Sequence, residues 1–190
     1  QDALKTREGL TSNATAIPPD APAEAFGIPA QDWYLYPLAH PNLGDMAYLS
    51  SYLWWLNGER DTYEQSQNIR LLRESLTQIQ SLAGDACLGL IYIPSKEHLY
   101  FPYADPAGNR QYVLQNGGHL ALNDAGWLDI VNEPVDYAVW DANKDNLHDV
   151  VADMIAEMDG WSFIDLLPVF QDMAGQGVMT YYPYDSHWSD

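Results

Sequence analysis

The sequence predicts an α/β protein with a mostly parallel sheet, because one order of elements occurs twice along the chain. An amphipathic helix expected at residues 62–83 is followed by a tight turn and the apolar run "CLGLIYI". A second amphipathic helix, expected at residues 147–158, is followed by a turn and the run "WSFIDLL". Strands joined through a helix pair in parallel by a right-handed crossover, so we expect both runs in one sheet with the helix 62–83 on a face.

The start of the chain has a different character. Residues 1–30 are small, polar and rich in proline, without a sustained hydrophobic period, so we expect an extended lead-in there and the α/β domain at residues 31–190. The segment after it is crowded with tryptophan and tyrosine, for which core or interface packing is the ordinary explanation and a sugar-stacking surface the alternative. A short helix is expected from Asp45 to Leu56, ended by Asn57-Gly58, since Asn and Gly accept the left-handed conformation that closes helices.

The helix expected at residues 62–83 has one apolar and one polar face. Its apolar residues recur at spacings of three and four; they are Ile69, Leu72, Leu76, Ile79 and Ala83. Gly84 ends the helix, and the continuous apolar run that follows, up to Pro94, is typical of a strand covered on both faces. In the second unit Gly160 lies in the turn and Pro168 ends the strand region.

The connection between the two units is long. Residues 104–146 are rich in Gly, Asn and Asp, and only "QYVL" and "DYAVW" have a strand-like composition. We therefore expect an elaborated insertion with a small hairpin.

Composition limits the partners of the protein. The chain has 190 residues, of which 47% are apolar, so it can bury a sizeable core. Its 27 acidic against 8 basic residues give a net charge of -19, which repels phosphate backbones and excludes nucleic acid as the expected partner. Cys87, the single cysteine, lies in an apolar run, so we expect a buried, unreactive thiol. No apolar run reaches the length of about 18 residues that a membrane span needs.

Several common catalytic motifs are absent from the sequence. It contains no Gly-rich phosphate loop, no Gly-x-Ser-x-Gly elbow, no Cys-x-x-Cys and no His-Glu-x-x-His. Asp185, His187 and Asp190 are cation ligands by type, but their spacing is a weak metal signal, and we expect neither a metal nor a cofactor. Four scattered histidines are expected to be surface or hydrogen-bonded structural residues, namely His40, His98, His119 and His148.

The last residues of the chain carry the strongest catalytic pattern. In "YYPYDSHWSD", Asp185 and His187 are two residues apart, so on an extended segment they point to the same side. The carboxylate can then fix the imidazole tautomer while the other ring nitrogen faces a hydroxyl, as a serine nucleophile requires. The simpler explanation is an ordinary Asp–His contact in a surface loop.

Three segments in order favour the catalytic explanation. "LGLIYIPSKEHLYFPY", "WSFIDLLPVFQDM" and "YYPYDSHWSD" resemble the SGNH-hydrolase-like domains of the alginate O-acetyltransferases and their relatives. The resemblance covers about residues 68–190, with residues 104–146 unmatched, and Asp-x-His-Trp is its most specific element. The positions that match are Pro94, Lys96 and Tyr100, then Ile164, Asp165 and Leu166, and finally Asp185, His187 and Trp188.

This resemblance implies a three-layer α/β sandwich and a Ser-His-Asp mechanism. His187 would be the general base and Asp185 its orienting acid, while Trp188 and Tyr184 would bind substrate. Lys96 follows a buried strand and Pro94, which places it at the carboxyl end of that strand, where it would either bind an anionic group of the substrate or pair with a carboxylate. In the family the nucleophilic serine lies downstream of Asp-x-His-Trp, and this sequence ends at Asp190, so the serine that the resemblance implies is not in this chain and the predicted fold is incomplete at its C-terminal end. The resemblance further implies an extracytoplasmic protein that acts on a cell-surface or secreted polysaccharide with an acetyl donor. Some relatives work beside a membrane-bound O-acyltransferase, which makes membrane association and such a partner part of the expectation.

Two other classes of function remain open from the sequence. A noncatalytic SGNH-like subunit of a surface or membrane-associated assembly would account for the aromatic-rich N-terminal half and for the missing nucleophile. A carbohydrate-binding module would use Trp33, Trp54 and Trp55 as stacking platforms. The module would leave Asp185 and His187 without a role.

Overall fold

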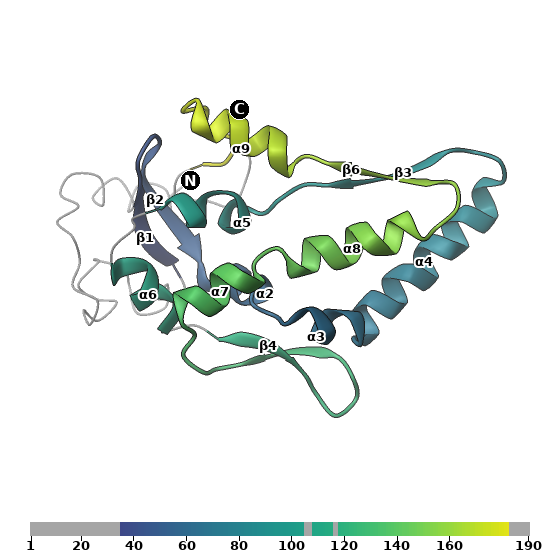
Figure 1. Cartoon of the computed structure of the whole chain (residues 1–190), viewed down its shortest axis with the longest axis horizontal. Coiled ribbons are helices and arrows are strands. Elements are labelled where there is room, and N and C mark those ends of the chain that lie inside the picture. Colours follow the sequence, from purple (N-terminus) through teal and green to yellow (C-terminus); the bar gives the residue numbers. More distant parts are fainter. Residues whose placement is uncertain (1–34, 105–107, 116–117, 183–190) are drawn as a thin grey trace, which may run out of the picture.

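The computed structural model describes residues 35–104, 108–115 and 118–182 (Figure 1). Within these residues the protein is a mixture of helices and short strands. The strands are β1 (Leu35–His40), β2 (Gly44–Leu49), β3 (Leu88–Tyr92), β4 (His119–Leu122), β5 (Leu128–Val131) and β6 (Trp161–Asp165). The helices are α2 (Ser50–Trp55), α3 (Arg60–Glu64), α4 (Gln67–Ala83), α5 (Lys96–Tyr100), the 3-10 turn η4 (Phe101–Tyr103), α6 (Gly108–Gln115), α7 (Tyr137–Asn143), α8 (Asn146–Ala156) and α9 (Leu167–Gly175).

The predicted parallel pairing is confirmed. β3 and β6 pair in parallel, with Leu88 opposite Trp161 and Tyr92 opposite Asp165. Helices α4 and α8 lie along this pair on the same side (Figure 1). Their apolar faces enclose a core of Leu76, Met154 and Ile155, against which the inward-facing strand residues pack. The two helix-and-strand units therefore fold as one layered α/β unit.

The opposite face of this sheet differs from the expectation. We predicted strands covered on both faces, but within the described structure only alternate residues are shielded. Ile91 is 56% exposed and Ile164 45% exposed, side by side on neighbouring strands. Burial alternates because a strand turns successive side chains to opposite faces, and α4 and α8 cover one face.

The prediction of a helix from Asp45 to Leu56 is wrong for the first half of that segment. Residues 44–49 form β2, which pairs antiparallel with β1, and helix α2 follows. Gly44 has φ +77, a left-handed conformation that favours glycine and reverses the chain at the hairpin. Met46 and Tyr48 are both fully buried, as residues two apart on one side of a strand can be.

Glycine at position 58 is required for a reason other than the predicted left-handed closure of a helix. Gly58 does not adopt a left-handed conformation. A Cβ at Gly58 would instead lie 2.6 Å from the ring of Tyr63, so glycine makes room for that buried ring. The long helix predicted at 62–83 is split here into α3 and α4, because the Ser66 hydroxyl accepts from the Ile69 amide at 3.2 Å and caps a new helix. Gly84, with φ +61, ends α4 as predicted.

The insertion at residues 104–146 holds a hairpin, but not at the predicted places. "QYVL" lies in helix α6 and "DYAVW" covers the start of α7, where Tyr137 and Trp140 stack one turn apart with ring centroids at 5.7 Å. The hairpin is formed by β4 and β5. Short apolar runs do not distinguish a helix from a strand, and here burial of Trp140 against α2 and η4 decides.

The largest core lies beside the β1–β2 hairpin. Trp54 packs against this core, whereas Trp55 keeps 37% of its surface exposed. Cys87 is exposed, so the predicted burial of its thiol is wrong; it lies in the turn before β3 rather than within the strand. In the described part of the chain no helix is long and apolar enough to cross a membrane.

A test of the helix-on-sheet core is the change Leu76→Ala. Leu76 is 6% exposed in the core between α4, α8 and the sheet, so its truncation should lower the free energy of unfolding by about 2–5 kcal/mol. Urea unfolding measures this. The matched control is Ile79→Ala on the same helix, because Ile79 is 47% exposed. Equal losses for the two variants would contradict the packing described here.

Candidate active site

The catalytic residues predicted from sequence lie outside the described residues. Tyr184, Asp185, His187 and Trp188 all fall in the segment 183–190, as does Asp190. Lys96 is described and is the first residue of helix α5, just after strand β3. The site can therefore be built from the surroundings of Lys96 and from residues 180–182, which lead to the Asp-x-His motif.

Lys96 is buried rather than open to a ligand. Its side chain is 1% exposed, and its ammonium donates hydrogen bonds to the carbonyl oxygens of Ala47 at 2.7 Å and Tyr182 at 2.9 Å. The ammonium also lies 5.6 Å from the centre of the Tyr48 ring, a cation–π contact. A buried charge is costly unless such groups replace its hydration. Lys96 thus links strand β2 to the segment that precedes Asp185.

Further contacts fasten that segment to the end of strand β3. The hydroxyl of Tyr181 donates to the carbonyl oxygen of Pro94, and Tyr181 is 3% exposed. The Tyr100 hydroxyl accepts from the Thr180 amide at 2.8 Å and shares a hydrogen bond with its hydroxyl at 2.5 Å. Each residue from 180 to 182 is therefore bound to the loop or helix that follows β3. The carboxyl end of a parallel strand is where α/β proteins place their ligand sites.

A second network occupies the same end of the sheet. His98 is 2% exposed; its Nε2 lies 2.8 Å from an Asp145 carboxylate oxygen and its Nδ1 lies 2.6 Å from the Tyr92 hydroxyl. The hydrogen bond from His98, followed by the charge of Lys144, lowers the pKa of Asp145 to about 2. Asp145 is then a carboxylate and can only accept, so His98 Nε2 carries the proton. Burial raises the pKa of Tyr92, whose neutral hydroxyl donates to Nδ1.

His148 lies next to this network. Its ring stacks edge-on against Tyr92 at 4.7 Å and lies 6.3 Å from the ring of His98. Its Nδ1 is 2.9 Å from Asp149, and its Nε2 is 3.2 Å from an Asp165 oxygen without being aligned for a hydrogen bond. Asp165 also accepts from the Leu167 amide at 2.9 Å and so fixes the start of α9.

The arrangement can orient groups and hold protons at fixed atoms. The hydrogen-bonded network of Asp145, His98 and Tyr92 has the order of an acid, an imidazole and a hydroxyl. The Tyr92 ring packs against the rings of His98, His148 and Phe163, so we assign this network a positioning role. No group of three or more metal-ligating side chains occurs among the residues that the structure describes.

The sequence reading missed that His98 and His148 meet. Asp145 and His148 are three apart at the start of a helix and thus share one face, which was a local signal. Their closeness to Tyr92 and His98 depends on the fold, because those residues are about fifty positions away.

The role assigned to Lys96 can be tested by the change Lys96→Met. Methionine keeps an apolar stem but loses the charge-assisted hydrogen bonds to Ala47 and Tyr182, so unfolding free energy should fall by about 1.5–3 kcal/mol. Lys144→Met is the control, since Lys144 forms ion pairs with the half-exposed Asp141 and Asp145, worth about 0–1 kcal/mol. Chemical denaturation of both variants gives the comparison. A smaller loss for Lys96→Met than for the control would contradict the anchoring role.

The Asp145–His98 contact predicts a pH dependence. The folded pKa of Asp145, about 2, is below its ordinary value of 3.8, so its contribution to stability is present above pH 3.8 and is lost as the pH falls towards 2. Asp145→Asn should lower the stability at neutral pH, and the stability difference between this variant and the native protein should shrink as the pH falls below 3.8. Urea midpoints across this range measure it, with Asp124→Asn in the β4–β5 turn as control. A constant difference between Asp145→Asn and the native protein from pH 6 to pH 2 would refute the contact.

Comparison of the chain with protein-family models, with curated proteins and with solved structures gave no match in any of the three.

Proposed function

We propose that this chain carries the Asp–His pair of a serine-dependent O-acetyltransferase or esterase of SGNH type. The substrate class is a cell-surface or secreted polysaccharide together with an acetyl donor, as in alginate acetylation. The proposal includes an extracytoplasmic location, a nucleophilic serine outside this chain, and work beside a membrane-bound O-acyltransferase or other assembly subunits.

The observation that carries the proposal is the anchoring of residues 180–182. Lys96, Pro94 and Tyr100 hold this segment at the carboxyl end of β3, and Asp185 follows three residues after Tyr182. A rigid approach is what a general base needs, because a proton acceptor must be held within hydrogen-bond reach of its hydroxyl. Lys96, expected from sequence to bind substrate, is therefore proposed as a positioning residue.

The chemistry follows from these roles. Asp185 accepts a hydrogen bond from one ring nitrogen of His187, which leaves the other nitrogen free to take the serine proton. The serine oxygen attacks the acetyl carbonyl, and the donor alcohol leaves with the proton from His187. A sugar hydroxyl or water then attacks the acyl-enzyme in the same way. Trp188 and Tyr184 are proposed to shield the pair from water, which strengthens the Asp–His hydrogen bond.

The open face of the β3–β6 pair supports the finer proposal of a three-layer sandwich. A parallel sheet is normally covered on both faces, yet Ile91, Ile164 and Ile93 are each at least 40% exposed on or next to this one. A third layer of helices would cover these side chains. Within the described residues, β3 and β6 pair with each other alone, so their outer edges have room for further strands.

A noncatalytic role in an assembly is the second candidate. The same apolar sheet face would then bind another subunit, and the mutually bonded Tyr92, His98 and Asp145 would serve stability alone. The third candidate, a carbohydrate-binding module, has less support because Trp54 packs against the core instead of presenting its ring as a stacking platform.

The change His187→Ala tests the proposed mechanism. In the full-length protein, turnover of an activated acetyl ester such as 4-nitrophenyl acetate should fall by a factor of about 10³ or more, because the serine loses the general base proposed for it. The matched control is His119→Ala, which replaces a histidine of the β4–β5 hairpin.

A second measurement separates catalysis from scaffolding without a substrate. An imidazole N–H held by a carboxylate gives a strongly downfield proton resonance. His98 with Asp145 should give one such resonance and His187 with Asp185 a second, and only the second should disappear in Asp185→Asn. Full activity of His187→Ala, or a native spectrum in which no downfield resonance is lost in Asp185→Asn, would favour the assembly role.

A further inference from the structure

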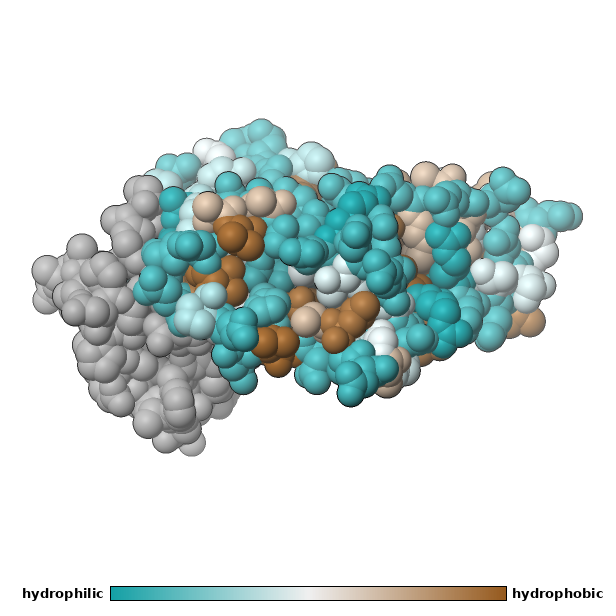
Figure 2. Space-filling model, turned by 60° about the horizontal axis from the view of Figure 1, so that its bottom comes forward, coloured by the Kyte–Doolittle hydropathy of each residue, from teal (hydrophilic) through white to brown (hydrophobic). Residues whose placement is uncertain are grey.

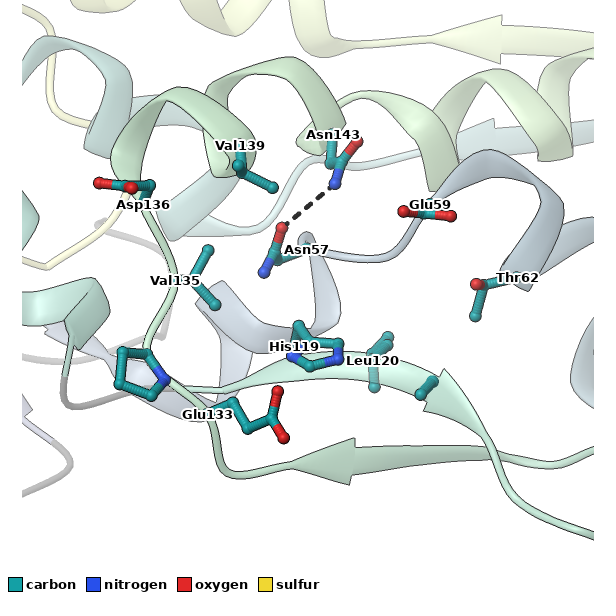
Figure 3. Close-up of a pocket in the computed structure, with 12 residues that line it drawn as sticks. Asn57, Glu59, Thr62, His119, Leu120, Glu133, Val135, Asp136, Val139 and Asn143 are labelled. Carbon is teal, nitrogen blue, oxygen red and sulfur yellow. Dashed lines mark hydrogen bonds between the residues drawn. The ribbon is translucent and has the colours of Figure 1, made fainter.

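A cavity of about 540 Å³ lies between the β4–β5 hairpin, helix α7 and the loop from α2 to α3 (Figure 3). It is separate from the network at the carboxyl end of β3 and shares no lining residue with it. The surrounding surface is mostly hydrophilic with separate apolar patches (Figure 2). The volume is in the range of pockets that hold small ligands.

The floor of this cavity contains a buried side chain with spare hydrogen-bond donors. Asn57 is 2% exposed. Its backbone N–H donates to the backbone carbonyl of Trp54, and its backbone carbonyl accepts from the Leu120 N–H at 3.0 Å. Its side-chain oxygen accepts from Asn143 at 3.4 Å. The side-chain nitrogen of Asn57 has no partner among the described residues, and Figure 3 shows it directed towards the space beside Val135.

Such a nitrogen favours an acceptor atom in the cavity. This nitrogen reaches the open space of the cavity, so an oxygen of a ligand can take the place of water there and gain a hydrogen bond that the protein itself does not make. The position of Asn57 is fixed on both sides, since its backbone joins the end of α2 to β4. The donor is therefore preorganised for an oxygen of a ligand.

The rim of the cavity carries negative charge without a positive partner. Glu59, Glu133 and Asp136 line it, and none of them forms an ion pair within the described structure. Gly118 keeps the hairpin end tight, because a Cβ there would lie 2.5 Å from the carbonyl oxygen of Val131. His119 and Glu133 consequently line the same end of the cavity (Figure 3).

Apolar side chains complete the wall. Leu120 and Val135 are 2% and 6% exposed and form its inner part, and Val139 lies at its edge (Figure 3). A matching ligand must combine an apolar C–H surface, an oxygen for Asn57, and donors or positive charge for the carboxylates. A sugar ring with hydroxyls and a protonated amine has all three. At this cavity an anionic uronic acid would be repelled by the carboxylates of the rim.

We propose that this cavity binds an amino-sugar unit with a free, protonated amine. The oxygen of one hydroxyl accepts from the Asn57 side chain, the ammonium is attracted by the combined negative charge of Glu133, Asp136 and Glu59 around the rim, and the ring packs on Val135 and Leu120. The site is independent of the proposed catalytic pair.

The experiment titrates the isotope-labelled protein with a glucosamine tetramer at a pH where its amines are protonated, observed by amide NMR. The side-chain NH₂ signals of Asn57 and the backbone signals of residues 118–121 and 133–136 should shift. The N-acetylated tetramer, which has the same ring but no charge, should bind at least 10-fold more weakly, and a uronic acid tetramer should not bind.

Matched variants separate a specific site from general attraction to an acidic protein. The double change Glu133→Gln and Asp136→Asn should weaken binding at least 10-fold, whereas Asp124→Asn with Asp129→Asn, which removes the same charge from the neighbouring β4–β5 hairpin, should leave it within about twofold. His187→Ala should bind like the native protein, so failure of the catalytic proposal would not affect this result. No shift at Asn57, equal affinity for the N-acetylated tetramer, or equal losses in the two double variants would each overturn the proposal.

Discussion

The burial of the Lys96 ammonium is the constraint on which the candidate site depends. A buried positive charge must be surrounded by oxygen atoms and rings, and here they come from Ala47 and Tyr48 of strand β2 and from Tyr182. Strand β2 and the segment at residue 182, which are distant in sequence, are thereby fixed relative to strand β3. Because each of these groups replaces part of the hydration that the buried charge has lost, moving any of them away costs free energy, and the arrangement has little freedom to shift.

The remaining interactions at this end of the sheet extend the same constraint. Ser95 caps α5, and all residues of that short helix are buried, so the helix is held by tertiary contacts rather than by its own propensity. The Tyr92, His98 and Asp145 network then fixes the junction of α7 and α8 to the end of β3. Together these contacts form a rigid edge from which the segment containing Asp185 and His187 departs.

Sequence reasoning located the elements whose patterns are long. Helix α4 and the strands β3 and β6 were found because a period of three to four, or a continuous apolar run next to a turn glycine, is sustained over many residues. It failed at residues 45–49, "QYVL" and "DYAVW", where the apolar runs are short and fit either state. At residues 45–49 the hydrogen bonds of the β1–β2 ladder decided that a strand forms. In the other two segments the burial of Leu114 and Trp140 in the core decided that a helix forms.

By itself the sequence determined the order of helix and strand in the two α/β units, the turn at Gly84, the net charge and the presence of an Asp-x-His pair. These follow from local periodicity, backbone preference and composition, which need no knowledge of contacts. Only the tertiary structure decided that Lys96 faces carbonyl oxygens rather than solvent, that His98 lies between Tyr92 and Asp145, and that Asn57 faces a cavity lined by carboxylates. Each of these joins residues about fifty or more positions apart, and such contacts arise from the packing of the whole chain, which no local pattern encodes.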